Sequence, residues 1–194
     1  MDFSQFGKAS GHVERRIRNI TGYLSGGGLG GPDMESAVTE YGKARSELAL
    51  VGSYAKTPEQ RQRYDKALGA LKEAAVSIIS RGLEAAKNDI GTSEVYMQLM
   101  GDASPSAYRA NAPKAPRSPF PLMVPNSERD PVTERAKTPY DAIDGTVRRA
   151  EGALGYSRRV AEAENNQTMI ADIDSLGKNV AELRRKLEAH ARGS

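Results

Sequence analysis

The sequence contains no cysteine and no tryptophan, and aromatic residues make up only 6% of its 194 positions. Without cysteine, the chain cannot form a disulfide framework, a thiolate zinc site or a cysteine nucleophile. Valine, isoleucine and phenylalanine do not fall into alternating runs, so β-strands are poorly supported. With 38% hydrophobic residues, the chain can build a modest helical core, but not a large α/β core around a deep pocket.

Long apolar runs are also missing from the sequence. The longest covers only a few residues, whereas a membrane-spanning helix needs about 20. No apolar stretch follows a basic N-terminus, so we expect no classical secretion signal and no transmembrane segment. These features predict a soluble protein that acts inside the cell or within a macromolecular assembly.

Charge and histidine content argue against several functions. The net charge is +3, and cations and anions nearly balance in each third of the chain, so no segment has the basic excess typical of nucleic-acid binding. His12 and His190 are the only histidines and fall in separate predicted elements, which does not favour a metal site or a catalytic triad. We therefore expect no catalytic residues, no metal, no cofactor and no small-molecule substrate.

A glycine-rich stretch resembles a nucleotide-binding pattern by composition alone. Gly26, Gly28 and Gly31 match G-x-G-x-x-G, but a dinucleotide site places this pattern between a strand and a helix. Here the pattern follows a predicted helix within a run of glycines, so we interpret it as a connection between helices.

Residues 1–91 show helical periodicity in three segments, which predicts a small antiparallel three-helix bundle. The first helix is expected to begin near Ser10, because Gly7 and Gly11 weaken anything earlier. The second follows a cap at Asp33 and ends near Tyr54. The third begins at the capping-box sequence from Thr57 to Gln60 and is expected to end at Gly91.

Residues 92–138 change character, with a short predicted turn of helix at 93–100 followed by a proline-rich extended linker. Within this linker lies an apolar cluster that includes Phe120, Leu122 and Met123. Such a cluster either docks on a partner protein or packs back onto the chain's own bundle, and the sequence favours neither.

Residues 139–194 contain no proline after Pro139 and carry two heptad seams, which predict one long coiled-coil-type helix. The second seam contains the predicted protein-interface residues Met169, Ile173, Leu176, Val180, Leu183 and Leu187. Between the seams, four-residue spacing from 161 to 173 is interpreted as a stutter in the coiled coil.

A helix of about 50 residues would extend roughly 75 Å, too far for the N-terminal bundle to cover its apolar stripe. The stripe is therefore predicted to pair with helices of other proteins, or with copies of the same chain. The alternative is a hairpin broken near Gly152–Gly155 that packs on the bundle.

The order of three N-terminal helices, a linker and a heptad helix resembles that of Qb-type SNARE proteins. The stretch from Gln167 to Ile173 is similar to the one that precedes the central polar layer of that family. The resemblance implies membrane fusion through a four-helix bundle formed with partner helices, with Met169 and Ile173 as core layers. The chain departs from the family at the central layer, where Leu176 falls, or Asn179 if the alignment slips by three. Its motif is also shortened, and we expect no membrane anchor.

Two functional hypotheses follow from these patterns. The first is a non-enzymatic structural or assembly protein that binds partners through its C-terminal helix and its linker, as a subunit of a large complex such as a virion or filament. The second is the SNARE-like function in vesicle trafficking.

Overall fold

The computed structural model describes residues 3–26, 32–100 and 139–192, and in these residues it contains five α-helices and no strand. The helices are α1 (Phe3–Ser25), α2 (Met34–Tyr54), α3 (Pro58–Met100), α5 (Pro139–Ala163) and α6 (Gln167–Arg192). The predicted all-α class is confirmed. The predicted proline-rich linker lies outside the described residues.

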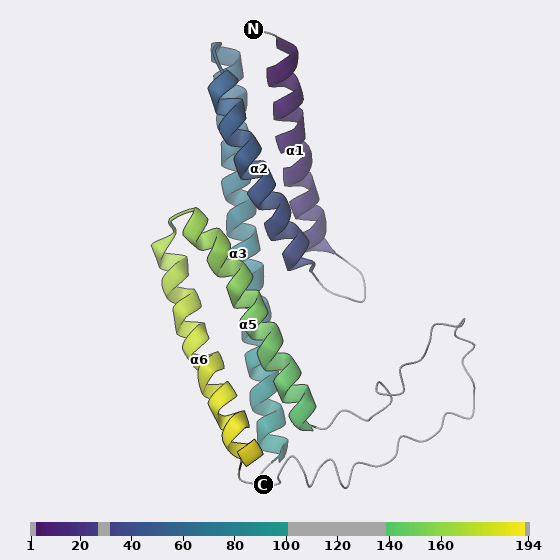
Figure 1. The fold of residues 1–194 in the computed structure, drawn as a ribbon, viewed down its shortest axis with the longest axis vertical. Helices are drawn as coiled ribbons and strands as arrows, with labels where there is room; N and C mark the ends of the chain where they lie inside the picture. The colour runs from purple at the N-terminus through teal and green to yellow at the C-terminus, as the bar shows by residue number, and fades with distance from the viewer. Residues whose placement is uncertain (1–2, 27–31, 101–138, 193–194) are drawn as a thin grey trace, which may run out of the picture.

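Helix α3 is the central element and contacts each of the other four helices (Figure 1). It has 43 residues, which corresponds to a length of about 65 Å. Helices α1 and α2 lie along its N-terminal half, and α5 and α6 lie along its C-terminal half. Buried apolar side chains from all five helices form one continuous core along this axis.

The starts of α2 and α3 follow the predicted capping chemistry. The Asp33 carboxylate accepts a hydrogen bond of 2.9 Å from the backbone N–H of Ser36. The Thr57 hydroxyl accepts one of 3.3 Å from the Gln60 N–H, and the Gln60 side chain accepts one of 3.1 Å from the Thr57 N–H. This reciprocal pair is a capping box, which satisfies two amides that the helix leaves free.

Helix α1 begins at Phe3, so the prediction of a start near Ser10 is wrong. Ser10 is buried inside the helix, and its hydroxyl donates to Glu14 at 3.4 Å. Phe6 is buried in the core, one turn before Ser10. Burial of a phenylalanine contributes about 1.5–3 kcal/mol, which offsets the cost of about 1 kcal/mol for each helical glycine.

Helix α3 continues without a break through Gly91 to Met100. The sequence suggested a C-cap at Gly91 and a separate short helix after it. Ser93 lies beyond the predicted end and is fully buried against α5. Its hydroxyl shares a hydrogen bond of 2.6 Å with the hydroxyl of Thr146. Packing against α5 thus extends α3 past a glycine that would otherwise favour termination.

The prediction of one long C-terminal helix is wrong, because residues 139–192 form the antiparallel hairpin α5–α6 (Figure 1). The turn lies at 164–166 and not at the glycines 152–155 suggested as the alternative break. Asn165 adopts a left-handed conformation with φ of 53°. The Asn166 side chain accepts a hydrogen bond of 3.2 Å from the Met169 N–H and so caps α6.

Candidate protein-binding groove

The predicted interface residues of the C-terminal seam lie inside the hairpin. Ile173, Val180, Leu183 and Leu187 are between 1% and 5% exposed and belong to the continuous core. Met169 and Leu176 are partly buried against the same core. The chain therefore covers this stripe itself, and the argument that the stripe requires a partner no longer applies. An interface role for these residues remains a prediction.

The other predicted interface residues, Phe120, Leu122 and Met123, lie outside the described residues. The structure therefore does not place the apolar cluster of the linker relative to the helices.

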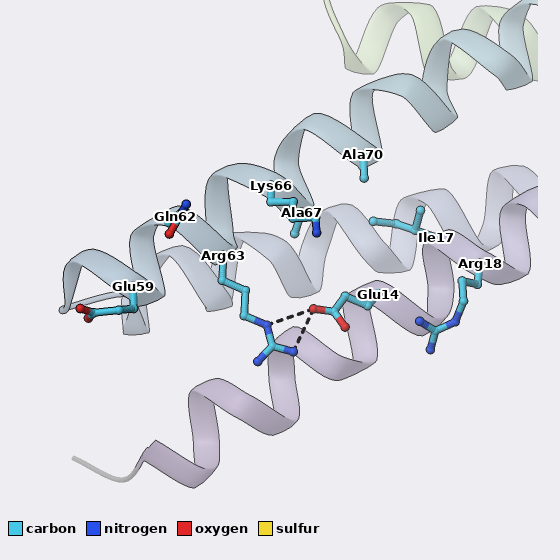
Figure 2. A pocket seen from close by; sticks show the side chains of 9 residues that line it. All are labelled: Glu14, Ile17, Arg18, Glu59, Gln62, Arg63, Lys66, Ala67 and Ala70. Carbon is cyan, nitrogen blue, oxygen red and sulfur yellow. Dashed lines mark hydrogen bonds and ion pairs between the residues drawn. The ribbon is translucent and has the colours of Figure 1, made fainter.

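A groove lies between α1 and α3 on the N-terminal half of the molecule (Figure 2). Its wider part encloses about 700 Å³, where Glu14, Ile17 and Arg18 of α1 lie across from Arg63, Lys66 and Ala67 of α3. A second hollow of about 330 Å³ continues it toward Leu24 and Arg81. The two hollows share Ile17 and Ala70, so they lie next to each other, and together we call them the α1–α3 groove.

The floor of the α1–α3 groove is apolar and built from small side chains on the α3 side. Ala67, Ala70 and Ala74 follow one another at helical spacing along α3, and Ile17 and Ile20 lie across from them on α1. Small residues at a helix surface allow another helix axis to approach closely, because axis separation depends on the side chains at the contact. Ile20, Ala67 and Ala74 are already buried by the packing of α1 against α3, so only Ile17 and Ala70 of the floor are partly exposed.

Helix α1 packs more extensively on α2 than on α3. Arg16 of α1 donates to Glu40 at 3.0 Å and to Glu47 at 2.8 Å, and both carboxylates belong to α2. The hydrogen bond from Arg16 lowers the pKa of Glu47. Burial would raise the pKa of Glu40, but hydrogen bonds from Lys43 and Arg16 hold it below its ordinary value. This bidentate arrangement fixes α1 on α2.

One ion pair crosses the groove. The Arg63 guanidinium donates to the Glu14 carboxylate at 2.9 Å, and Figure 2 shows the two side chains reaching toward each other from α3 and α1. Both side chains are more than a third exposed, at 47% and 39%. An exposed pair of this kind contributes only about 0–1 kcal/mol, so a competing ligand can displace it.

The sequence analysis did not single out this groove, because it followed the larger apolar residues of each helix. The available signal was the run of Ala67, Ala70 and Ala74 on one helical face. Alanines at that spacing leave space that longer side chains would fill.

Residues 3–26, 32–100 and 139–192 contain no group of three or more histidine, aspartate or glutamate side chains that could hold a metal ion. Within the same ranges, no helix combines the length and apolar character needed to cross a membrane.

Comparisons with known proteins gave no match: no family model fits the chain, and no curated protein and no solved structure is significantly similar to it.

Proposed function

We propose that this chain is a non-enzymatic structural protein that binds other proteins as a subunit of a larger assembly. The observation that carries the proposal is the α1–α3 groove, a depression with a charged rim in which Ile17 and Ala70 remain partly exposed. A groove between two helices is a common docking place for the apolar face of a third helix.

The length of the groove fits this function. Along α3 it extends from Glu59 to Arg81, which corresponds to about 33 Å of helix. A partner helix of about six turns would cover it and would complete a four-helix arrangement with α1, α2 and α3. In this proposal α1, α2 and the N-terminal half of α3 act together as the binding bundle.

The α5–α6 hairpin has a supporting role in the proposed function. It packs along α3, and Arg184 of α6 pairs with Asp144 and Glu151 of α5 at 2.7 and 2.8 Å. Bracing α3 along its second half keeps its full length straight, so that a partner bound at one end is held at a fixed distance from the other end. A rigid spacer of this kind suits a subunit of a particle or filament.

The SNARE-like alternative requires a different state of the chain. Helix α6 would have to leave α5 and α3 so that Ile173, Val180 and Leu183 could pair with partner helices. That step exposes side chains that are now buried, at a cost of about 1.5–3 kcal/mol for each fully buried aliphatic residue.

Site-specific photo-crosslinking from the native source tests the proposed function. A photoreactive amino acid replaces Ala70 on the groove floor of the full chain, and a second variant carries it at Arg185, on the exposed face of α6. We expect a discrete protein adduct in a fixed ratio to the chain from position 70 and not from position 185. The same adducts from both positions, or none from position 70, contradict the proposal.

A further inference from the structure

The described helices form two three-helix units that share α3. Helices α1 and α2 pack on the N-terminal half of α3, whereas α5 and α6 pack on its C-terminal half (Figure 1). Within a native protein, local openings commonly follow supersecondary elements of this kind, so a hairpin such as α5–α6 can open by itself. Contacts that join the two units without α3 therefore decide whether they open separately or together.

Two hydrogen bonds join the units directly. The Tyr41 hydroxyl of α2 donates to the Glu164 carboxylate, and the Arg45 guanidinium of α2 donates to the Ala163 carbonyl oxygen at 2.8 Å. Both acceptors lie where α5 ends and the turn to α6 begins. Tyr41 is only 3% exposed, so its bond is made at the edge of the core. We call this pair of contacts the α2–turn clasp.

The clasp holds a turn that has one defined conformation. Asn165 follows Glu164 and adopts the left-handed conformation, and the Asn166 side chain then caps α6. These two residues fix the direction in which α6 leaves α5. A contact to Glu164 therefore positions both helices of the hairpin and not α5 alone.

The start of α2 depends on the hairpin for part of its packing. A Cβ atom built at Gly82 of α3 would lie 2.0 Å from the Ser157 hydroxyl oxygen of α5 and 3.3 Å from the Met34 methyl carbon of α2, so the three helices meet there. If the hairpin moves away, Tyr41 loses its acceptor and Met34 loses neighbouring atoms, and both changes destabilise the first turns of α2.

We propose that the α2–turn clasp couples the two three-helix units, so that the α5–α6 hairpin opens together with the first turns of α2. By thermodynamic linkage, any ligand that stabilises one unit then also suppresses opening of the other. This coupling is a property of the chain itself and does not depend on which surface binds a partner.

Native-state hydrogen exchange of the full chain, followed by mass spectrometry, tests the coupling. The substitution Arg184→Gln weakens the hairpin from within, because it removes the charged partner of Asp144 and Glu151. With the clasp intact, we expect the α2 amides around Tyr41 to exchange about threefold faster in this variant, although the substitution lies on α6.

The same substitution is then made in a chain without the clasp, Tyr41→Phe with Arg45→Gln. In that background Arg184→Gln should still accelerate exchange in α6 and should leave the α2 amides unchanged. Circular dichroism establishes that the variants keep the helical fold. If the double variant loses it, Tyr41→Phe alone removes the buried bond and serves as the background, where the effect on α2 should be reduced.

A matched control makes the same chemical changes on exposed residues of α1. In Tyr23→Phe with Arg18→Gln, the clasp is intact, so Arg184→Gln should accelerate exchange in α2 as it does in the parent chain.

Two results would overturn the inference. If Arg184→Gln leaves α2 exchange unchanged while the clasp is intact, the two units open independently. If it accelerates α2 exchange equally with and without the clasp, the coupling passes through α3 and the clasp has no part in it.

Discussion

The hydroxyl of Tyr41 on α2 donates a hydrogen bond to the carboxylate of Glu164, at the turn that joins α5 to α6. Beside it, the Arg45 guanidinium donates to the carbonyl oxygen of Ala163 at 2.8 Å. These contacts link the two groups of helices at a point other than α3. They fix the α5–α6 turn against α2, and with it the direction in which the hairpin lies along α3.

The first prediction concerns the substitution Tyr41→Phe. The variant keeps the buried ring but leaves the Glu164 carboxylate without its donor, so we expect a loss of about 1–2 kcal/mol in the free energy of unfolding. Urea unfolding followed by circular dichroism measures this loss. Tyr23→Phe is the matched control, because Tyr23 is one of the exposed aromatic residues, and its stability should change by less than about 0.5 kcal/mol. Equal effects in the two variants would argue against the Tyr41–Glu164 bond.

A second prediction follows from the pKa of Tyr41. Burial raises this pKa, and the hydrogen bond to the Glu164 carboxylate raises it further. The folded state therefore holds the phenolic proton at pH values where the unfolded chain loses it. The resulting stability is fully present below the ordinary tyrosine pKa of about 10 and is lost as the pH rises above it. We expect the stability difference between the parent chain and Tyr41→Phe to shrink between about pH 10 and 12, in urea titrations at fixed pH. A difference that stays constant would contradict this linkage.

The third prediction concerns Gly82, where α3 and α5 approach closely. A Cβ atom at this position would lie 2.0 Å from the Ser157 hydroxyl oxygen and 2.9 Å from the Ala153 carbonyl oxygen. We expect Gly82→Ala to destabilise the protein by about 1–3 kcal/mol, because overpacking outweighs the gain in helix propensity. Thermal unfolding measures the change.

Gly91 provides the control for this test in the same helix. No atom lies within 4 Å of a Cβ built at Gly91, so Gly91→Ala should stabilise the protein by about 0.5–1 kcal/mol. If both alanine variants were stabilising, α3 and α5 would not approach as closely as the structure indicates. Trimming Ser157 to alanine should rescue Gly82→Ala only in part, because the Ala153 carbonyl oxygen remains close.

Features that depend on local chemistry could be predicted from the sequence. The caps at Asp33 and at Thr57–Gln60 involve residues within one turn of each other, so the start of α2 and the start of α3 were correctly predicted. The all-α class followed from the spacing of apolar residues. Each of these inferences uses interactions that do not depend on the rest of the fold.

Helix ends that depend on distant contacts could not be predicted in the same way. The burial of Phe6 extends α1 toward the N-terminus, and the Ser93–Thr146 contact extends α3 past Gly91. Both contacts join residues far apart in the sequence, and their free energy outweighs the local preference of glycine. The α1–α3 groove was missed for a related reason, since the periodicity of a helix does not reveal where two packed helices leave a depression between them.

The C-terminal turn shows how one local signal was misread. Four-residue spacing around Asn165 and Asn166 was interpreted as a stutter in a continuous helix. Asparagine tolerates the left-handed conformation better than most residues, and it is also a strong N-cap. Two consecutive asparagines therefore favour a helix–turn–helix break, which the structure shows at that place.

The fourth prediction tests this turn through its backbone conformation. Asn165 has a φ of 53°, where a β-branched side chain is strained, so Asn165→Val should cost about 1–2 kcal/mol in the free energy of unfolding. Asn165→Gly is the matched control, since glycine adopts this conformation freely and should leave stability nearly unchanged. Urea unfolding of the two variants beside the parent chain measures both effects. In a continuous helix the order would differ: glycine would be the more damaging residue at position 165, because its helix propensity is lower than that of valine. If Asn165→Val is more stable than Asn165→Gly, the C-terminal segment is one uninterrupted helix. If Asn165→Gly is the more stable variant, the result supports the hairpin.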